Sequence, residues 1–305
     1  MIHEYAVDPD ALSSLNEIWQ ALEQFGVAQG RVLVQCPKTW WKTVTENLKN
    51  AERVLHPAEY KSLEERCFRL KEAKKIIRRK NLKYDVEKPF VEALAAEHAD
   101  RPFRAVLQLE RAATGLIPVL SRFDLHEGNP LWKVRRSLAV PKTADALAGA
   151  VVPLLRISTD FLFVDPYFGS KPEKYQSLVK MLQGAAAQNA SLKRIEIHTK
   201  KAVGTAVFIQ DKARAAIMPR LPPGIEIKVF QWKESEGGER LHDRFILTDR
   251  GGLSSSYGWD SGTPGQSTEV SLLDDDSYLF RWGQYQEDTA AFDLAGEPFV
   301  IKSCR

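Results

Sequence analysis

The clearest strand pattern in the sequence lies in residues 241–252, Leu-His-Asp-Arg-Phe-Ile-Leu-Thr-Asp-Arg-Gly-Gly. Residues two apart in an extended chain share a face, so His242 and Arg244 are predicted to point the same way. Apolar residues such as Phe245 would then fill the opposite face. Asp249 follows the apolar run, and the two glycines after it indicate a turn.

The polar residues of this stretch suggest a site for phosphate. The guanidinium of an arginine binds two phosphate oxygens at once. A strand that carries His242 and Arg244 to the same end therefore predicts a phosphate site there.

The spacing of the three polar residues, His242-x-Arg244-x-x-x-x-Asp249, resembles the H-x-K-x-x-x-x-D signature of the phospholipase D superfamily. The earlier segment 163–168, Phe-Val-Asp-Pro-Tyr-Phe, is similar to the strand-ending sequence that often opens such lobes. The resemblance covers the C-terminal half of the chain only. It implies an α/β/α lobe in which His242, Arg244 and Asp249 form the catalytic motif, and within that motif we expect Asp249 to hold the local network together.

The family chemistry needs two histidines at one phosphate. One attacks phosphorus to form a phosphohistidine, and the other protonates the leaving oxygen. This chain carries one motif, so the resemblance implies a homodimer with the active site on its two-fold axis. It implies no metal ion and no other cofactor. The segment His198-Thr-Lys200 lacks the aspartate and precedes His242 by too few residues for a second lobe, so we interpret it as a chance match.

Two further polar residues are candidates for the same site. Glu269 could accept the imidazole N–H and hold the ring in one tautomer, although a surface strand end is an equally simple interpretation. Ser256 lies where the family often has Gly-Ser-x-Asn after the aspartate, a motif that is missing here. Its hydroxyl is available to a phosphate oxygen.

The composition is that of a soluble globular protein. The chain has 305 residues, of which 44% are hydrophobic and 27% charged, enough for one large or two ordinary domains. No apolar run approaches the roughly 20 residues of a membrane span, and the first residues do not resemble a signal peptide. Three widely spaced cysteines favour a reducing compartment. We therefore expect a cytoplasmic protein without membrane contact.

Residues 1–125 are predicted to form a mainly helical N-terminal domain. Apolar residues at helical spacing predict three helices, which run over about 9–25, 37–50 and 57–80. Residues 31–35 are compatible with a strand or with a connector.

Basic residues gather in two segments. Between Arg66 and Lys83 the chain has nine Lys or Arg against one Glu, a local balance of +8, and a shorter patch lies within 131–142. One interpretation is a track for nucleic-acid phosphates. The alternative is a solvated face, which in the first segment also complements the C-terminal end of a helix. The candidates for nucleic-acid contact are Lys74, Lys75, Arg78, Arg79, Arg135 and Arg136.

The C-terminal half alternates strands with helices. Strands are predicted near 160–165, 192–198, 225–230 and 269–273, with helices over 144–157, 172–188 and 205–220. Such alternation favours a sheet of parallel strands that is covered on both faces.

The predicted fold class is therefore α/β, in two domains. A mainly helical domain (1–125) and a linker (126–140) precede an α/β/α phospholipase D-like lobe with a mostly parallel sheet (141–305). Residues 251–265, rich in Gly and Ser, are predicted to be a mobile loop beside the site.

The resemblance and the basic segments together predict a metal-independent phosphodiesterase. The expected activity is a nuclease that cleaves DNA, with RNA left open, through a phosphohistidine at a homodimeric site. Such lobes joined to a helical half resemble effectors of bacterial defence or restriction systems, which implies a defence-system partner protein. The alternative is a catalytically impaired relative that binds nucleic acid or regulates a partner. Arg244 in place of the family's lysine motivates that alternative.

Overall fold

The computed structural model describes residues 1–305 except 13, 53–54, 110–116, 189, 202–205 and 304–305. Cys304 and the expected helix start at Thr205 lie outside the described residues. The chain divides into two compact units, Met1–Arg135 and Arg136–Arg305, called the N-terminal and C-terminal units below. This division falls within the segment that was expected to be a linker. No helix among the described residues is long and apolar enough to span a membrane.

The N-terminal unit is built on a five-stranded sheet, ordered β3-β2-β1-β4-β5, in which every described pairing is parallel. Its strands are β1 (His3–Val7), β2 (Arg31–Val34), β3 (Ile76–Ile77), β4 (Ala105–Leu107) and β5 (Val119–Leu120). Helices make up more of this unit than strands, as expected for a mainly helical domain, but the parallel sheet that they cover was not predicted. These strands have two to five residues and are largely buried, so they carry no alternating pattern.

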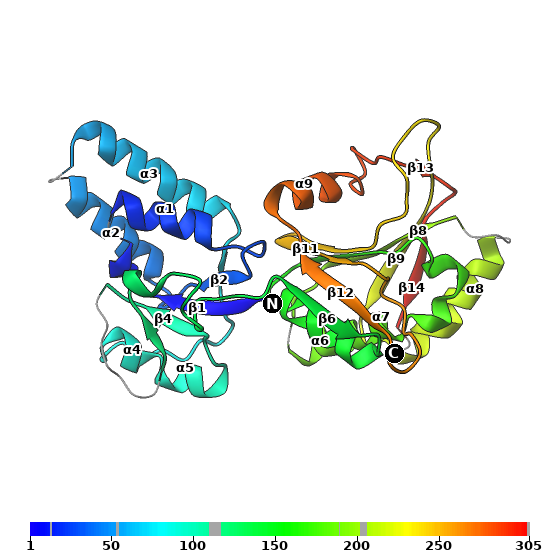
Figure 1. The fold of residues 1–305 in the computed structure, drawn as a ribbon, viewed down its shortest axis with the longest axis horizontal. Helices are drawn as coiled ribbons and strands as arrows, with labels where there is room; N and C mark the ends of the chain where they lie inside the picture. Colours follow the sequence, from blue (N-terminus) through cyan, green and yellow to red (C-terminus); the bar gives the residue numbers. More distant parts are fainter. Residues whose placement is uncertain (13, 53–54, 110–116, 189, 202–205, 304–305) are drawn as a thin grey trace. The chain divides into compact units, whose positions relative to one another are not determined.

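Helices cover both faces of this sheet. They are α1 (Leu15–Gln24), α2 (Trp40–Glu52), α3 (Pro57–Glu72), α4 (Phe90–Ala93) and α5 (Ala95–Asp100). The first three lie on one side of the sheet and the last two on the other (Figure 1). Ser14 caps α1 through a capping box with Glu17. The helix α3 ends eight residues before the predicted Lys80, so most of the basic segment lies outside the helix.

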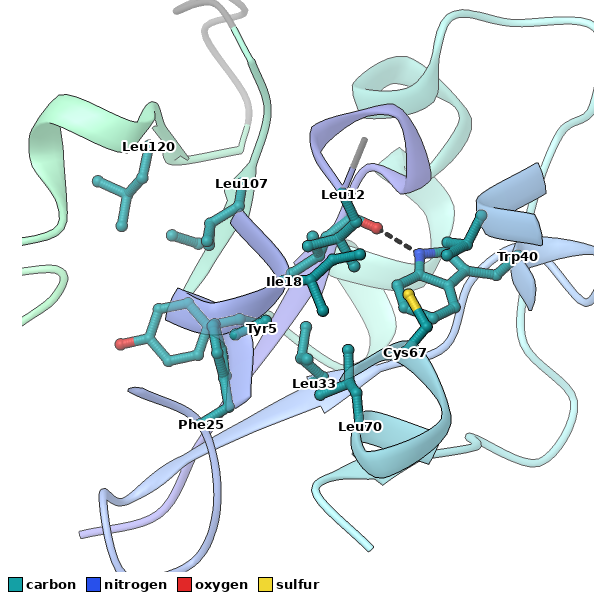
Figure 2. Close-up of a cluster of buried hydrophobic side chains, with 14 of the residues drawn as sticks. Tyr5, Leu12, Ile18, Phe25, Leu33, Trp40, Cys67, Leu70, Leu107 and Leu120 are labelled. Carbon is teal, nitrogen blue, oxygen red and sulfur yellow. Dashed lines mark hydrogen bonds between the residues drawn. The ribbon is translucent and has the colours of Figure 1, made fainter. Parts of the chain in front are cut away.

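The core of this unit joins the helices to the sheet. Figure 2 shows Tyr5 and Leu33, from two adjacent strands, beside Ile18 of α1 and Leu70 of α3. The indole N–H of Trp40 donates to the carbonyl of Val7 at 2.7 Å. A buried N–H without an acceptor would cost roughly 1–3 kcal/mol, so this bond lets a large aromatic side chain fill the core.

The C-terminal unit contains a nine-stranded mixed sheet with the path β13-β9-β8-β7-β10-β11-β12-β6, and β14 also pairs with β9. Its strands are β6 (Ser137–Pro141), β7 (Asp160–Val164), β8 (Arg194–Lys200), β9 (Glu226–Lys233), β10 (Phe245–Thr248), β11 (Gly251–Ser255), β12 (Ser267–Leu272), β13 (Asp293–Leu294) and β14 (Phe299–Lys302). Among the described strands of this sheet, only β7, β8 and β9 pair in parallel. The prediction of a mostly parallel sheet is therefore wrong, because the strands after β9 return as antiparallel neighbours.

Helices also cover both faces of the mixed sheet. They are α6 (Ala144–Leu155), α7 (Gln176–Ala187), α8 (Ala206–Ile217) and α9 (Asp275–Gly283). The helix α9 lies on one face and α6 and α7 on the other (Figure 1). A Cβ at Gly184 would lie 2.7 Å from a methyl group of Val152, so glycine allows α7 to approach α6 closely.

The strand that carries the motif is shorter than predicted. It begins at Phe245, so His242 and Arg244 lie in the connection that precedes it. The apolar face was predicted correctly, since Leu241, Phe245 and Leu247 belong to one buried cluster.

The strands β10 and β11 form a hairpin whose two-residue turn is Asp249-Arg250. The predicted turn at Gly251-Gly252 and the start of the predicted mobile loop are therefore strand β11. A Cβ at Gly252 would lie 2.8 Å from Leu273 and 2.9 Å from Leu247, so glycine permits close packing there.

Candidate functional site

The pairing of the sheet brings four separate segments to one edge. The strands β7 and β10 are antiparallel, with Phe245 opposite Val164, so the residues after β7 meet the residues before β10. Since β10 and β11 are also antiparallel, with Phe245 opposite Ser254, the residues after β11 reach the same edge. Lys142, which follows β6, contacts them. The site is therefore assembled from connections that flank four strands.

His242 and Arg244 share one aromatic neighbour at this edge. The guanidinium carbon of Arg244 lies 4.9 Å from the ring centroid of Tyr167, and the His242 ring meets Tyr167 edge to face at 6.3 Å between centroids. The side chain of His242 is exposed. Within the described part of the chain, no carboxylate forms an ion pair with Arg244. Its positive charge is therefore available to an anion.

Gly258 leaves room for the arginine. A Cβ on this residue would lie 3.4 Å from Cδ and Nε of Arg244 and 3.1 Å from a carboxylate oxygen of Asp260. Its φ of +83° is also unfavourable for other residues.

Asp165 is a buried carboxylate that joins two of the segments of the site. Its carboxylate is buried and accepts the backbone N–H groups of Tyr167 at 3.0 Å and Trp259 at 3.2 Å. Burial raises the pKa of this carboxyl, although those hydrogen bonds, that of Tyr175 and the charge of Arg244 act in the opposite direction. The carboxyl therefore joins the connection after β7 to the connection after β11 by hydrogen bonds.

Lys142 is a buried cation of the same site. Its ammonium donates to Asp260 Oδ1 and to the carbonyl of Tyr257, both at 2.6 Å, and lies 4.9 Å from the Tyr257 ring centroid. Its charge is largely balanced by Asp260. This lysine therefore fixes the loop after β11, and Arg244 remains the less compensated cation.

These groups line a cleft with a volume of about 560 Å³, which we call the lysine cleft. Lys171 and Lys174 lie on its rim, exposed and without an ion-pair partner among the described residues. The lining residues are Lys142, Asp165, Tyr167, Ser170, Lys171, Lys174, Tyr175, His242, Arg244, Ser256, Tyr257 and Asp260. Four Lys or Arg thus oppose two Asp, a balance that favours an anionic ligand.

A second cleft of about 640 Å³ shares His242, Arg244 and Ser256 with the first. We call it the serine cleft, because Ser254, Ser255, Ser256, Ser271 and Ser277 all line it. The two shared side chains of the motif therefore lie between two adjoining hollows.

Glu269 and Ser256 lie at this second cleft. Glu269 accepts a short hydrogen bond from the hydroxyl of Ser137, and no hydrogen bond joins it to His242 among the described contacts. Ser256 accepts the backbone N–H of Glu269 at 3.0 Å. Glu269 and Ser256 thus line the same cleft as His242. The predicted hydrogen bond between Glu269 and the imidazole is not found among the described residues.

Asp249 lies at the opposite end of β10 from His242 and is not brought into either cleft. Its Oδ1 accepts the backbone N–H groups of Thr159 at 2.8 Å and Asp160 at 3.1 Å. The side chain therefore joins the hairpin turn to the start of β7, and its position corrects the expected catalytic placement.

The basic residues of the N-terminal unit have different environments. Arg79 is buried, and it pairs with Glu4 at 2.7 Å and Glu97 at 2.9 Å while its guanidinium lies over the ring of Phe103. It cannot reach a phosphate without breaking these pairs, so its assignment to a nucleic-acid track is corrected. Arg78 is exposed and donates to the amide oxygen of Gln35 at 2.7 Å.

The remaining basic candidates are more accessible. Lys74 is exposed, with a φ of +50°, and Lys75 is half-buried. Arg135 and Arg136 are exposed on either side of the boundary between the units. The backbone carbonyl of Arg136 accepts the N–H of Leu272, which extends the pairing of β6 with β12.

Several site residues escaped the sequence analysis. The sequence pattern indicated Asp165 and Tyr167 only as part of a strand ending, and it did not indicate Lys171, Lys174 or Asp260. One signal was available, because ligands often bind beyond the carboxyl ends of parallel strands and Asp165 directly follows such a strand. The lysines carried no comparable signal.

Comparisons with known proteins add little. No family model matches the sequence, and no curated protein matches it. Among solved structures, the archaeal chromatin protein TrmBL2, described as showing a novel mode of DNA binding, aligns over 84% of this chain and 83% of its own. The identity is 11% and the TM-score 0.28, too low for an argument. The described residues contain no group of three or more His, Cys, Asp or Glu positioned to hold a metal ion.

Proposed function

We propose that the C-terminal unit is a metal-independent phosphodiesterase that cleaves nucleic acid at the junction of the lysine and serine clefts. The observation that supports this most is that an exposed imidazole, His242, and the guanidinium of Arg244, which has no ion-pair partner among the described residues, lie against one aromatic ring. An imidazole can serve as nucleophile or proton donor near neutral pH. A guanidinium offsets charge that develops on the non-bridging oxygens of phosphate.

In the proposed reaction a ring nitrogen of His242 attacks phosphorus, and a P–N bond forms while the bond to the leaving oxygen breaks. The leaving oxygen takes a proton from a second imidazolium. In the second half, water gives a proton to that now neutral imidazole and attacks phosphorus, and the P–N bond breaks. Arg244 holds the non-bridging oxygens throughout, and the exposed Lys171 and Lys174 attract the substrate backbone.

The second imidazolium would come from another copy of the chain. Among the described residues, His242 is the only histidine that lines either cleft, and the other histidine of the C-terminal unit, His198, is buried in the core. A homodimer with the two clefts facing one phosphate would supply both groups. Excess His242→Ala protein should therefore suppress wild-type activity, because a mixed dimer holds one imidazole per site. A monomer by light scattering with full activity would contradict this arrangement.

The direct test is cleavage of plasmid DNA and of a labelled RNA in excess EDTA. Wild type should cleave at least one of them, His242→Ala should lose cleavage, and His126→Ala should keep it. His126 is an exposed histidine of the N-terminal unit and serves as the matched control. Alkaline quenching should trap a phosphate on the peptide that contains residue 242. Full activity in His242→Ala would overturn the proposed site.

A nucleic-acid-binding protein without activity is the second candidate. It is favoured by one observation, that no described residue hydrogen-bonds to the ring nitrogens of His242, so nothing fixes its tautomer. This candidate predicts binding of labelled oligonucleotides, loss of binding in Arg244→Ala, and no cleavage by wild type under any tested condition.

The biological setting belongs to the same proposal. A nuclease of this kind would serve as the effector of a bacterial defence or restriction system, with a partner protein that controls it. Expression of wild type, but not of His242→Ala, should then protect bacteria from phage or arrest their growth. Equal outcomes for the two proteins would contradict this role.

A further inference from the structure

Two tyrosines project from the walls of the lysine cleft. The side chain of Tyr257 is 67% exposed and that of Tyr167 is 47% exposed, although both line the cleft. Aromatic rings of this size gain about 1.5–3 kcal/mol when they are buried, so leaving two of them in water beside one site is unfavourable for folding alone. A ligand that covers the rings would recover this free energy.

The backbones of both tyrosines are held by hydrogen bonds. The N–H of Tyr257 donates to Thr268 Oγ1 at 2.9 Å, and its carbonyl accepts the ammonium of Lys142 at 2.6 Å. The N–H of Tyr167 donates to Asp165 at 3.0 Å. The rings are therefore presented on ordered connections, which lowers the entropy that a ligand must remove when it packs on them.

Each ring also has a cation beside it. The ammonium of Lys142 lies 4.9 Å from the Tyr257 centroid, and the guanidinium of Arg244 lies 4.9 Å from that of Tyr167. Arg244 is not paired with a carboxylate, and the rim adds Lys171 and Lys174. The cleft thus alternates flat apolar faces with positive charge.

We propose that the lysine cleft takes single-stranded nucleic acid, with bases stacked on Tyr167 and Tyr257 and the intervening phosphate at Arg244. This rests on the proposed function and names its substrate class. Stacked aromatic rings within a basic groove are suited to unpaired bases, whose faces are free. In a duplex the base faces are covered by their neighbours, so projecting rings contact only the outer surface. The cleft volume of about 560 Å³ lies within the range of pockets that bind small-molecule ligands.

Fluorescence anisotropy tests the proposal, with a labelled 20-nucleotide DNA strand, the same sequence in RNA, and the DNA duplex. All proteins carry His242→Asn so that no substrate is consumed. The parent protein, in which His242→Asn is the only change, should bind a single strand more tightly than the duplex. Comparison of the DNA strand with the RNA strand shows which of the two it prefers. Tyr257→Ala should weaken single-strand binding about 5- to 150-fold, the range expected for one stacked base.

Three further variants separate stacking from charge and from misfolding. Tyr257→Phe keeps the ring and should bind as the parent does. Phe208→Ala removes an exposed aromatic side chain that lines neither cleft and should also bind normally. Lys171→Ala should weaken single strand and duplex alike and reduce the salt dependence of binding.

The outcomes distinguish this inference from the proposed function. Equal affinity for duplex and single strand, or unchanged binding in Tyr257→Ala, overturns the single-strand inference and leaves a nucleic-acid site at His242 intact. If none of the three nucleic acids binds to the parent protein, the proposed function fails together with the inference.

Discussion

The guanidinium of Arg244 lies over the ring of Tyr167, 4.9 Å from its centroid, while Gly258 leaves the space that the arginine stem occupies. A planar guanidinium can stack on an aromatic ring and still present N–H donors to an anion at its edge. A lysine at this position would keep the charge and lose the stacked geometry.

Arginine 244 should therefore tolerate lysine better than alanine. Arg244→Ala is expected to lower the cleavage rate about 10²- to 10³-fold, the usual loss for one group that stabilises a transition state. Arg244→Lys should lose only about two- to fivefold, the equivalent of a cation–π contact of about 0.5–1 kcal/mol. Single-turnover cleavage with saturating protein measures both. Equal losses in the two variants would show that the charge is not what matters.

Asp249 should prove to be a stability residue. Asp249→Ala leaves the N–H groups of Thr159 and Asp160 without their acceptor, and it should lower the free energy of unfolding by about 1–3 kcal/mol. Asp249→Asn keeps an acceptor oxygen and should lose less. Urea unfolding gives the stabilities, and cleavage at 15 °C gives the activity of the folded protein. A variant that is stable but inactive would restore a catalytic role to this aspartate.

The ion pairs of Arg79 should contribute to the stability of the fold and not to the binding of nucleic acid. Arg79→Ala removes one ion pair from each of the buried carboxylates of Glu4 and Glu97. Arg101 still pairs with Glu97 at 2.9 Å, but breaking buried pairs of this kind costs about 3–5 kcal/mol. Arg78→Ala, on the next residue, removes an exposed side chain and should cost much less. Thermal unfolding followed by circular dichroism compares them. A loss below 1 kcal/mol in Arg79→Ala would contradict the buried network.

The buried pair Glu196 and His198 should make the C-terminal unit sensitive to acid. Burial lowers the pKa of His198 despite the neighbouring carboxylate, so the folded state holds it neutral. Burial also opposes ionisation of Glu196, but hydrogen bonds from His198 and Arg194 outweigh it and lower the pKa of Glu196 to about 2. Both folded-state values are depressed, so the stability is complete above about pH 6.5 and is lost as pH falls.

His198→Gln isolates the first part of that loss. The wild type should lose stability from pH 7.5 to 5.5 as the unfolded chain takes up a proton on His198, and the variant should lose less over this interval. Urea unfolding at the two pH values measures the difference. Identical pH dependence in the two proteins would exclude His198 as the cause.

The C-terminal unit was the more predictable half, because its elements carry long patterns. Residues 160–164 were expected as a strand and form β7, and the helix expected from Ala144 was found as α6. What the pattern did not contain was strand direction. An apolar run such as β10 has the same composition whether its neighbour is parallel or antiparallel, so the mixed sheet could not be recognised.

The N-terminal sheet was missed for a different reason. The strand β1 pairs with β2 and with β4, whose partner residues lie about 30 and 100 positions further along the chain. Strands of two to five residues are too short for a periodic signal, and their stability comes from these distant partners. The burial of Arg79 was equally invisible, since a run of basic residues does not tell which one faces a carboxylate.

The sequence predicted the motif residues of the candidate site but not the residues that surround them. His242 and Arg244 were found because they are two residues apart in one chain segment. Asp165 and Tyr167 are more than 70 residues away, and only the pairing of β7 with β10 brings them together. Proximity of this kind follows from topology, which a single sequence pattern does not contain.

The anchored Asp249-Arg250 turn helps to fix the position of the His242 imidazole at the other end of β10. A slip of β10 by two residues against β7 would preserve the alternation of its faces, yet it would carry His242 about 7 Å along the sheet edge, away from Tyr167. The anchoring of the turn to residues 159 and 160 opposes such a slip. The carboxylate of Asp249, which lines neither cleft, would thus set the position of the proposed nucleophile, His242.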